Sequence, residues 1–226
     1  FFELRSCVGF FCPAVNALPS THADPAVAAT YPVMELFHTV QGEGLFSGQA
    51  ACFIRLGGCD VGCAWCDVKE SWDASAHPRR SAADLAAEAA SHPARIVVVT
   101  GGEPLMHDLQ PLTDALRARG LRTHLETSGT HPLTGDWHHV CFSPKKFKPP
   151  VPGFHQHADE LKVIVVNRHD LAWADTHAAL VRPACACFLQ PEWDRREAVM
   201  PLIVEKVKAD PRWRISLQIH KTLNIP

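Results

Sequence analysis

Three cysteines lie close together in the first third of the chain, with the spacing Cys59-x3-Cys63-x2-Cys66. They directly follow an apolar segment, 51–56, that is expected to be a strand. Three thiolates on one loop can bind three corners of an iron–sulfur cube and leave the fourth iron without a protein ligand. Structural zinc is the main alternative, but zinc prefers a closed tetrahedral set, and His77 is the nearby candidate for a fourth ligand. The spacing favours a [4Fe-4S] cluster.

The total of nine cysteines in 226 residues is odd, and their distribution is uneven. The six outside the cluster of three are scattered: Cys7, Cys12, Cys52, Cys141, Cys185 and Cys187. This distribution fits a reducing compartment with one metal site better than a disulfide framework. Cys185 and Cys187 would share one face of a strand, and we expect buried thiols there rather than a second metal pair.

A second motif, Gly101-Gly102-Glu103-Pro104, follows an expected strand at 96–100. Alone, such a sequence is most often a tight turn at the end of a strand. Other expected strands also end in polar or Gly-rich residues, at 126–129, 143–145 and 190–191. In parallel α/β sheets and barrels the site forms at the carboxyl ends of the strands, so these residues are predicted to share one site with the cysteine loop.

The elements that must position these residues alternate between short apolar runs and helical patterns, which is typical of an α/β fold. Strands are expected at 33–40, 51–56, 96–100, 122–126, 140–143, 161–166, 186–190 and 214–219. Helices are expected from Ser81, where Asp84 completes a capping-box variant, and at about 109–119, 170–180 and 194–208. The helix near 119 is predicted to stop at Gly120.

Composition and charge limit the classes of partner. The formal net charge is -2, charged residues make up 20% and hydrophobic residues 46% of the chain, so one globular domain is expected at 31–226. No apolar run approaches the roughly 18 residues of a membrane span, and no polybasic stretch is present, so neither a membrane nor a nucleic acid is an expected direct partner. We expect residues 1–30 to be a disordered N-terminal extension; a signal peptide is disfavoured because Glu3 lies near the start and no basic region precedes the apolar stretch.

The cysteine spacing and the Gly-Gly-Glu-Pro motif together resemble the radical S-adenosylmethionine superfamily. Further segments over about residues 31–226 look like the 7-carboxy-7-deazaguanine synthase family: Thr39-Val-Gln-Gly-Glu-Gly44, Phe53-Ile-Arg55, Cys66-Asp67, Glu126-Thr-Ser-Gly-Thr130, Ser143-Pro-Lys145, Leu189-Gln-Pro191 and Gln218-Ile-His-Lys-Thr-Leu-Asn-Ile-Pro226. This resemblance implies a partial, modified TIM-type (βα) barrel and a homodimer.

The resemblance also implies the reaction. Family members are carbon–nitrogen lyases that convert 6-carboxy-5,6,7,8-tetrahydropterin to 7-carboxy-7-deazaguanine with release of ammonia, on the route to queuosine in tRNA and other 7-deazapurines. The implied cofactors are a [4Fe-4S] cluster, S-adenosyl-L-methionine and Mg2+. An electron donor such as a flavodoxin or ferredoxin and a cytoplasmic location are implied as well.

Roles for individual residues follow from the same resemblance. Cys59, Cys63 and Cys66 match the cluster ligands. The positions that match substrate-binding residues are Val40, Gln41, Gly42, Arg55, Thr100, His220 and Pro226, and Glu43 and Arg55 are expected to act in catalysis. The positions that match cofactor-binding residues are Gly102, Glu103, Ser143, Pro144, Lys145 and Gln190.

One position departs from the family pattern. Members usually carry a threonine two residues after the third cysteine, where its hydroxyl ligates Mg2+, but this chain has Val68. A valine side chain offers no oxygen to a hard cation. Asp67 is left as a candidate for the Mg2+ shell. The alternatives are that Asp67, water and substrate hold Mg2+, that the ion binds weakly, or that the enzyme does not need it.

Two alternatives remain open on the sequence. A glycyl-radical-enzyme activating enzyme shares the cysteine loop but acts on a protein, and it is disfavoured by the Gln-Gly-Glu-Gly and His-Lys-Thr-Leu-Asn segments. A zinc-stabilised interaction module would need a closed set of four ligands.

Overall fold

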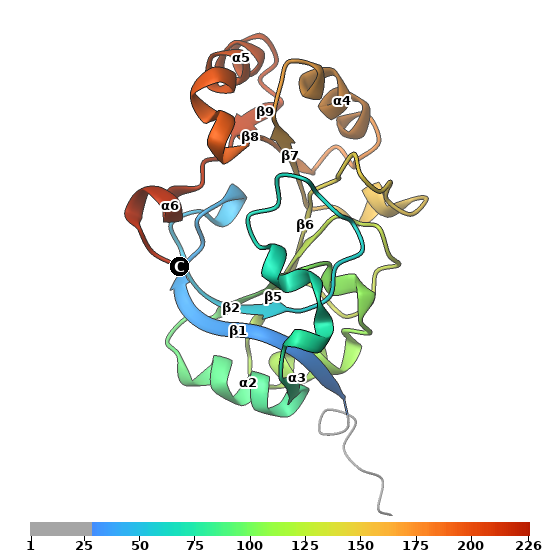
Figure 1. Cartoon of the computed structure of the whole chain (residues 1–226), viewed down its shortest axis with the longest axis vertical. Helices are drawn as coiled ribbons and strands as arrows, with labels where there is room; N and C mark the ends of the chain where they lie inside the picture. Colours follow the sequence, from blue (N-terminus) through green and yellow to red (C-terminus); the bar gives the residue numbers. More distant parts are fainter. Residues whose placement is uncertain (1–28) are drawn as a thin grey trace, which may run out of the picture.

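One mixed nine-stranded sheet organises the chain, and the computed structural model describes residues 29–226 of it (Figure 1). Residues 1–28 of the expected N-terminal extension lie outside the described residues. The strands are β1 (Thr30–Val40), β2 (Ala50–Leu56), β3 (Arg79–Ser81), β4 (Ile96–Gly101), β5 (Arg122–Thr127), β6 (His139–Phe142), β7 (Glu160–Val165), β8 (Ala186–Pro191) and β9 (Trp213–Ile215).

The sheet is open and follows the order β3-β1-β2-β4-β5-β6-β7-β8-β9. β1 runs antiparallel to β2 and β3, whereas β2 and β4 to β9 are parallel. Parallel strands covered on both faces are continuously apolar, as the buried run Ile96–Val99 of β4 illustrates. The sheet curves strongly without joining its edge strands in residues 29–226 (Figure 1), which confirms the predicted partial barrel.

Helices cover the outer face of the curved sheet (Figure 1). They are α2 (Ala82–Ser91), α3 (Gln110–Ala118), α4 (His169–Ala178) and α5 (Arg196–Ala209). The short α6 (Ile219–Leu223) instead lies near the C-terminus, where two of its residues, His220 and Lys221, line a pocket. The predicted start of α2 is confirmed, because the backbone N–H of Asp84 donates to Oγ of Ser81 at 3.0 Å. No helix within residues 29–226 combines the length and the apolar character that crossing a bilayer requires.

The C-terminal stretch differs from the prediction. A strand over 214–219 was wrong, since β9 ends at Ile215 and the chain then turns into α6. Ser216 is buried and still held beside β8, because its hydroxyl donates to Oε1 of Gln190 at 2.7 Å. Beyond it the N–H of Ile219 donates to the carbonyl of Gly42 at 3.0 Å, so the chain has left the sheet at that point. The short edge strand β3 was not predicted.

Candidate active site

An open chamber of about 840 Å³ lies at the carboxyl ends of the parallel strands. The cysteine loop, the Gly-Gly-Glu-Pro turn, the Gln-Gly-Glu-Gly segment and the C-terminal residues all line it. Every expected site residue borders this chamber except Pro144, which borders a smaller neighbouring cavity with Trp65. The structure thus brings together segments spread over almost the whole described chain.

Backbone hydrogen bonds fix the base of the cysteine loop. The N–H of Gly58 donates to the carbonyl of Ser71 at 2.7 Å, and the N–H of Cys59 donates to the carbonyl of Trp72 at 3.1 Å. The N–H of Glu103 donates to the carbonyl of Gly58 at 2.8 Å. The two most specific sequence motifs therefore meet through main-chain contacts.

The two glycines of this turn have no space for a side chain. A Cβ on Gly101, whose φ is +128°, would lie 2.1 Å from the carbonyl oxygen of Leu56. A Cβ on Gly102 would lie 2.1 Å from the carbonyl oxygen of Gly58 and 2.9 Å from Cβ of Cys59. Glycine is needed here because the turn packs directly against the cysteine loop.

Glu103 links the ends of two neighbouring strands. The residue is 2% exposed, and its carboxylate accepts hydrogen bonds from the Thr127 hydroxyl at 2.6 Å and the Ser128 N–H at 2.8 Å. The Ser128 hydroxyl and the Leu105 N–H complete the set. With both oxygens satisfied inside the protein, Glu103 acts on the chamber by holding the end of β4 against the end of β5.

The three cysteines of the loop fit an iron–sulfur cluster better than a single ion. All three are free thiols that line the chamber, and no other cysteine of residues 29–226 does so. No three His, Cys, Asp or Glu side chains in this described part converge as ligands of one metal ion. A cluster does not require such convergence, since each thiolate binds a different iron. His77, the candidate fourth zinc ligand, lies outside the chamber wall.

The Gln-Gly-Glu-Gly segment supports the C-terminal residues. The N–H of Ile219 donates to the carbonyl of Gly42 at 3.0 Å, and the His220 ring packs so closely that a Cβ on Gly42 would lie 2.1 Å from its Nδ1. The Thr39 hydroxyl donates to the carbonyl of Pro226 at 3.3 Å. These contacts carry His220 and Pro226 to the chamber wall and connect β1 to the far end of the sheet.

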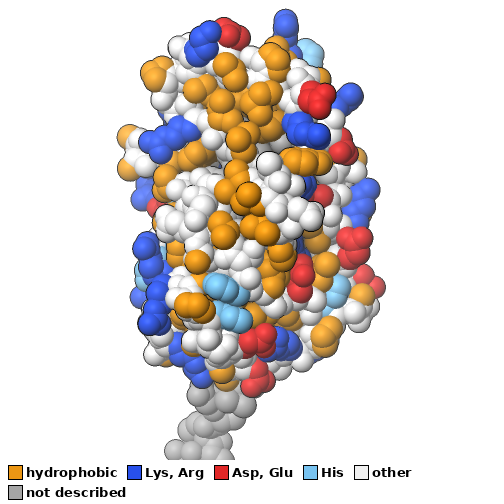
Figure 2. Space-filling model, turned by 90° about the vertical axis from the view of Figure 1, so that its left-hand side faces the viewer, with side chains coloured by type: hydrophobic (Ala, Val, Ile, Leu, Met, Phe, Trp, Pro, Cys, Tyr) orange, Lys and Arg blue, Asp and Glu red, His pale blue; other side chains and the backbone are white. Residues whose placement is uncertain are grey.

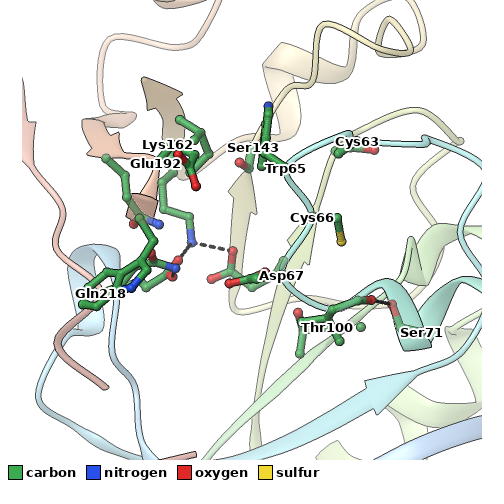
Figure 3. Close-up of a pocket in the computed structure, with 18 of the residues that line it drawn as sticks. Cys63, Trp65, Cys66, Asp67, Ser71, Thr100, Ser143, Lys162, Glu192 and Gln218 are labelled. Atoms are coloured by element: carbon green, nitrogen blue, oxygen red, sulfur yellow. Dashed lines mark hydrogen bonds and ion pairs between the residues drawn. The ribbon is translucent and has the colours of Figure 1, made fainter. Parts of the chain in front are cut away.

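A buried lysine joins two carboxylates in the chamber, as Figure 3 shows. Lys162 extends from β7, and its ammonium donates to Oε2 of Glu43 at 2.6 Å and to Oε2 of Glu126 at 2.9 Å. Its side chain is only 5% exposed. Gln218 donates to the other oxygen of Glu43 at 2.9 Å. These hydrogen bonds among Lys162, Glu43, Glu126 and Gln218 therefore connect β5, β7, the segment after β1 and the C-terminal stretch.

The group formed by Lys162, Glu43 and Glu126 gives its two carboxylates different proton affinities. Burial opposes ionisation of Glu43, but the charge and the hydrogen bond of Lys162 lower its pKa to about 2. Burial is the main cause that raises the pKa of Glu126. The pKa of Lys162 lies well above its usual value because its anionic neighbours outweigh burial, so its ammonium stays charged.

Arg55 and Lys145 are two of the other cations that line the chamber. Nε of Arg55 donates to Glu35 at 2.5 Å, which leaves the other guanidinium donors for a ligand. The Lys145 ammonium donates to the carbonyl of Ser143 at 2.7 Å and to its hydroxyl, and burial lowers the pKa of Lys145. Both cations lie where the sequence predicts anion-binding groups.

The residues beside the third cysteine do not fit a Mg2+ site. Val68 borders the chamber without an oxygen, and the Asp67 carboxylate is already paired with the Lys221 ammonium at 2.7 Å. Glu43, Glu103 and Glu126, which also line the chamber, already accept hydrogen bonds from protein donors. Mg2+ requires several oxygen ligands in near-octahedral geometry, so no part of the chemistry is assigned to it.

Comparisons with known proteins agree with this site. Residues 53–140 match the Radical SAM superfamily. The 7-carboxy-7-deazaguanine synthase of Flavobacterium psychrophilum is 53% identical over 86% of this chain and 92% of that protein. The corresponding protein of Synechocystis sp. is 46% identical, over 88% of this chain and 95% of that protein. The chain belongs to the 7-carboxy-7-deazaguanine synthase family.

The crystal structure of QueE from Escherichia coli supports the assignment, with a TM-score of 0.77, 34% identity and coverage of 87% of this chain and 99% of that one. As a member of the 7-carboxy-7-deazaguanine synthase family, the chain is a radical S-adenosylmethionine enzyme of the lyase class. Membership implies a [4Fe-4S] cluster and S-adenosylmethionine as cofactors. The predicted family and fold class are confirmed, and the activating-enzyme and zinc-module alternatives are not favoured.

Lys162 and Gln218 are site residues that the sequence-based prediction missed. The charge of Lys162 within the otherwise apolar run Leu161–Val165 was the available signal, because an unpaired charge is costly in a central parallel strand. Gln218 was quoted within the C-terminal motif but given no role, and it lies in a segment that was expected to be a strand.

Proposed function

We propose that this enzyme converts 6-carboxy-5,6,7,8-tetrahydropterin to 7-carboxy-7-deazaguanine with release of ammonia. The observation that carries the proposal is the common chamber, which is lined by the cysteine loop, the Gly-Gly-Glu-Pro turn, Gln41 to Glu43 and Pro226. In this family that combination belongs to one reaction, which requires a reduced cluster, a sulfonium cofactor and a pterin in the same space.

The cofactor side of the chamber is assigned to the cysteine loop and the adjoining strand ends. Cys59, Cys63 and Cys66 would hold the cluster, whose reduction of S-adenosylmethionine supplies the radical chemistry when both are bound. The residues that would hold S-adenosylmethionine are Gly102, Ser143, Lys145 and Gln190, with Glu103 fixing the turn. An ammonium and a hydroxyl held together in Lys145 and Ser143 suit a carboxylate and a ribose.

The substrate side is assigned to the ends of β1 and β2 and to the C-terminal residues. Arg55 would bind the pterin carboxylate, because its free guanidinium donors can form a bidentate pair. Glu43 is ionised and can accept N–H donors of the ring. Backbone and side-chain groups would enclose the ring edges, from Val40, Gln41, Gly42, Thr100, His220 and Pro226.

These groups act chiefly by position. A reactive radical has little selectivity of its own, so the side chains must hold the substrate C6 hydrogen next to the cofactor and exclude water. The contacts of His220 with Gly42 and of Pro226 with Thr39 bring the C-terminal segment over the chamber. Closure of the chamber by this C-terminal segment would hold the substrate in place and exclude water.

Partners and location belong to the same proposal. Hydrophobic side chains gather on the face seen in Figure 2. Ile215, Leu217 and Leu223, which lie in or close to α6 in the sequence, are exposed, and exposed apolar surface of this kind supports a homodimer. A flavodoxin or ferredoxin would supply electrons. We place the enzyme in the cytoplasm, where a reducing environment keeps the thiols of the described cysteines available for a cluster.

Anaerobic reconstitution tests the proposal directly. Wild type, Cys59→Ala and the matched control Cys185→Ala are compared for bound iron and sulfide and for ammonia released from the carboxytetrahydropterin in the presence of S-adenosylmethionine and a reductant. Wild type and Cys185→Ala are expected to hold the cluster and release ammonia, and Cys59→Ala neither. Bound zinc without iron, or equal loss in both variants, contradicts the assignment.

A further inference from the structure

Lys162 has a donor that the protein does not use. An ammonium group carries three N–H donors. Two of them serve Glu43 and Glu126, and no third acceptor from residues 29–226 lies within hydrogen-bonding distance of Nζ. Lys162 borders the chamber, and Figure 3 shows its nitrogen in the space between the walls.

The two ion pairs hold this third donor in a fixed position. A lysine side chain is flexible when exposed, but the Lys162 side chain is 5% exposed and is paired with carboxylates from β5 and from the segment after β1. Glu43 is in turn fixed by Gln218. A preorganised donor of this kind binds a correctly placed acceptor on a ligand more selectively than a mobile donor does.

The neighbouring carboxylate provides the complementary group. Glu43 is ionised, lines the chamber, and each of its oxygens accepts one protein donor, so each retains capacity for another. Its Oε2 lies 2.6 Å from Nζ of Lys162. The chamber thus presents a hydrogen-bond donor directly beside an acceptor pair.

The amide-like edge of a pterin has the opposite pattern, with a ring carbonyl next to a ring N–H and an exocyclic amino group. We propose that Lys162 is a specificity-determining residue whose third N–H donates to this ring carbonyl while Glu43 accepts from the adjacent N–H groups. The chamber would then select 4-oxo pterins over rings that carry an amino group at the same position. This inference rests on the proposed function and deepens it.

The physical reason for discrimination is an unpaired buried donor. An amino group in place of the carbonyl would direct its own N–H toward the Lys162 ammonium and leave a charged donor without a partner. Sites built to hydrogen-bond a polar group reject analogues that lack it by large factors, here estimated as about 100-fold in Kd.

The test measures binding to the cluster-reconstituted enzyme loaded with S-adenosylmethionine, without reductant. Kd is determined by anaerobic calorimetry for 6-carboxytetrahydropterin and its 4-amino analogue, with wild type, Lys162→Met and Lys162→Arg. Wild type is expected to prefer the 4-oxo ligand about 100-fold. Lys162→Met should reduce that preference at least tenfold, Lys162→Arg should largely retain it, and the Kd of S-adenosylmethionine should stay the same.

Each outcome separates the two claims. Equal affinity of wild type for both ligands overturns the role of Lys162 and needs no variant, so the result stands even if Lys162→Met fails to fold. A full preference retained in Lys162→Met overturns it as well. If wild type neither binds nor converts the carboxytetrahydropterin, the proposed function itself fails.

Discussion

Substitution of Gly102 by alanine tests whether the Gly-Gly-Glu-Pro turn must touch the cysteine loop. The added Cβ would lie 2.1 Å from the carbonyl oxygen of Gly58, where ordinary contacts begin at 3.4 Å. The obstacle is backbone and cannot rotate away, so the turn must move by about 1 Å or more. That movement would weaken the hydrogen bond from the Glu103 N–H to the Gly58 carbonyl.

Two magnitudes follow from this displacement. Overpacking of this kind costs about 1–3 kcal/mol in the free energy of unfolding. A misplacement of about 1 Å at a reacting site costs on the order of 100-fold in rate. Gly102→Ala is therefore expected to fold, to retain iron and sulfide, and to lose about two orders of magnitude in kcat together with affinity for S-adenosylmethionine.

The matched control is Gly153→Ala. Gly153 has φ +81° and nothing within 4 Å of an added Cβ, so it reports only the strain of a left-handed alanine, about 1–2 kcal/mol. Thermal unfolding, calorimetric binding of S-adenosylmethionine and turnover are measured for both variants. Unchanged kcat and cofactor affinity in Gly102→Ala would refute the argument that this contact positions the cofactor.

Three other expectations can be measured with the same protein. Titration with Mg2+ should leave wild-type turnover nearly unchanged, because Val68 offers no oxygen and Asp67 is paired with Lys221. A strict requirement for Mg2+ would contradict the conclusion that the residues beside the third cysteine form no Mg2+ site. Lys221→Met should lower the free energy of unfolding by less than about 1 kcal/mol, since the ion pair of Lys221 with Asp67 is partly exposed. The same variant should raise KM for the pterin. An unchanged KM would count against a role of the C-terminal segment in substrate binding. Burial, aided by the charge of His155, lowers the pKa of His177 to about 4 from 6.5. Between these two pH values the unfolded chain therefore binds more protons than the folded chain. The free energy of unfolding of the apoprotein should consequently fall by about 3 kcal/mol from pH 6.5 to pH 4. His177→Asn should remove this part of the decrease in a urea titration, and an identical pH dependence would show that another group is responsible.

Local sequence patterns predicted most of the fold. The apolar run in β4 and the Ser81 cap of α2 depend on neighbours in sequence, and both lie where the pattern placed them. The strand predicted at 214–219 ends at Ile215, and Ile219 bonds to Gly42, which is far away in sequence, instead of continuing the sheet. Such contacts leave no periodic signal.

The candidate site divides in the same way. The cysteine loop and the Gly-Gly-Glu-Pro turn are contiguous motifs, so their residues could be named from the sequence. Lys162 could not be assigned to the site from the sequence, because periodicity places it on a strand but does not show which face of that strand lines the chamber. Pro144 shows the converse, since it lies between two residues that line the chamber, Ser143 and Lys145, and itself borders another cavity.

The mass of the product tests the central claim most directly. Reconstituted enzyme is incubated anaerobically with 6-carboxytetrahydropterin, S-adenosylmethionine and a reductant, and the products are separated and weighed by mass spectrometry. The account predicts 7-carboxy-7-deazaguanine and one ammonia for each pterin consumed. Unchanged pterin, or a product that retains all of its nitrogen, in a preparation with an intact cluster would contradict it.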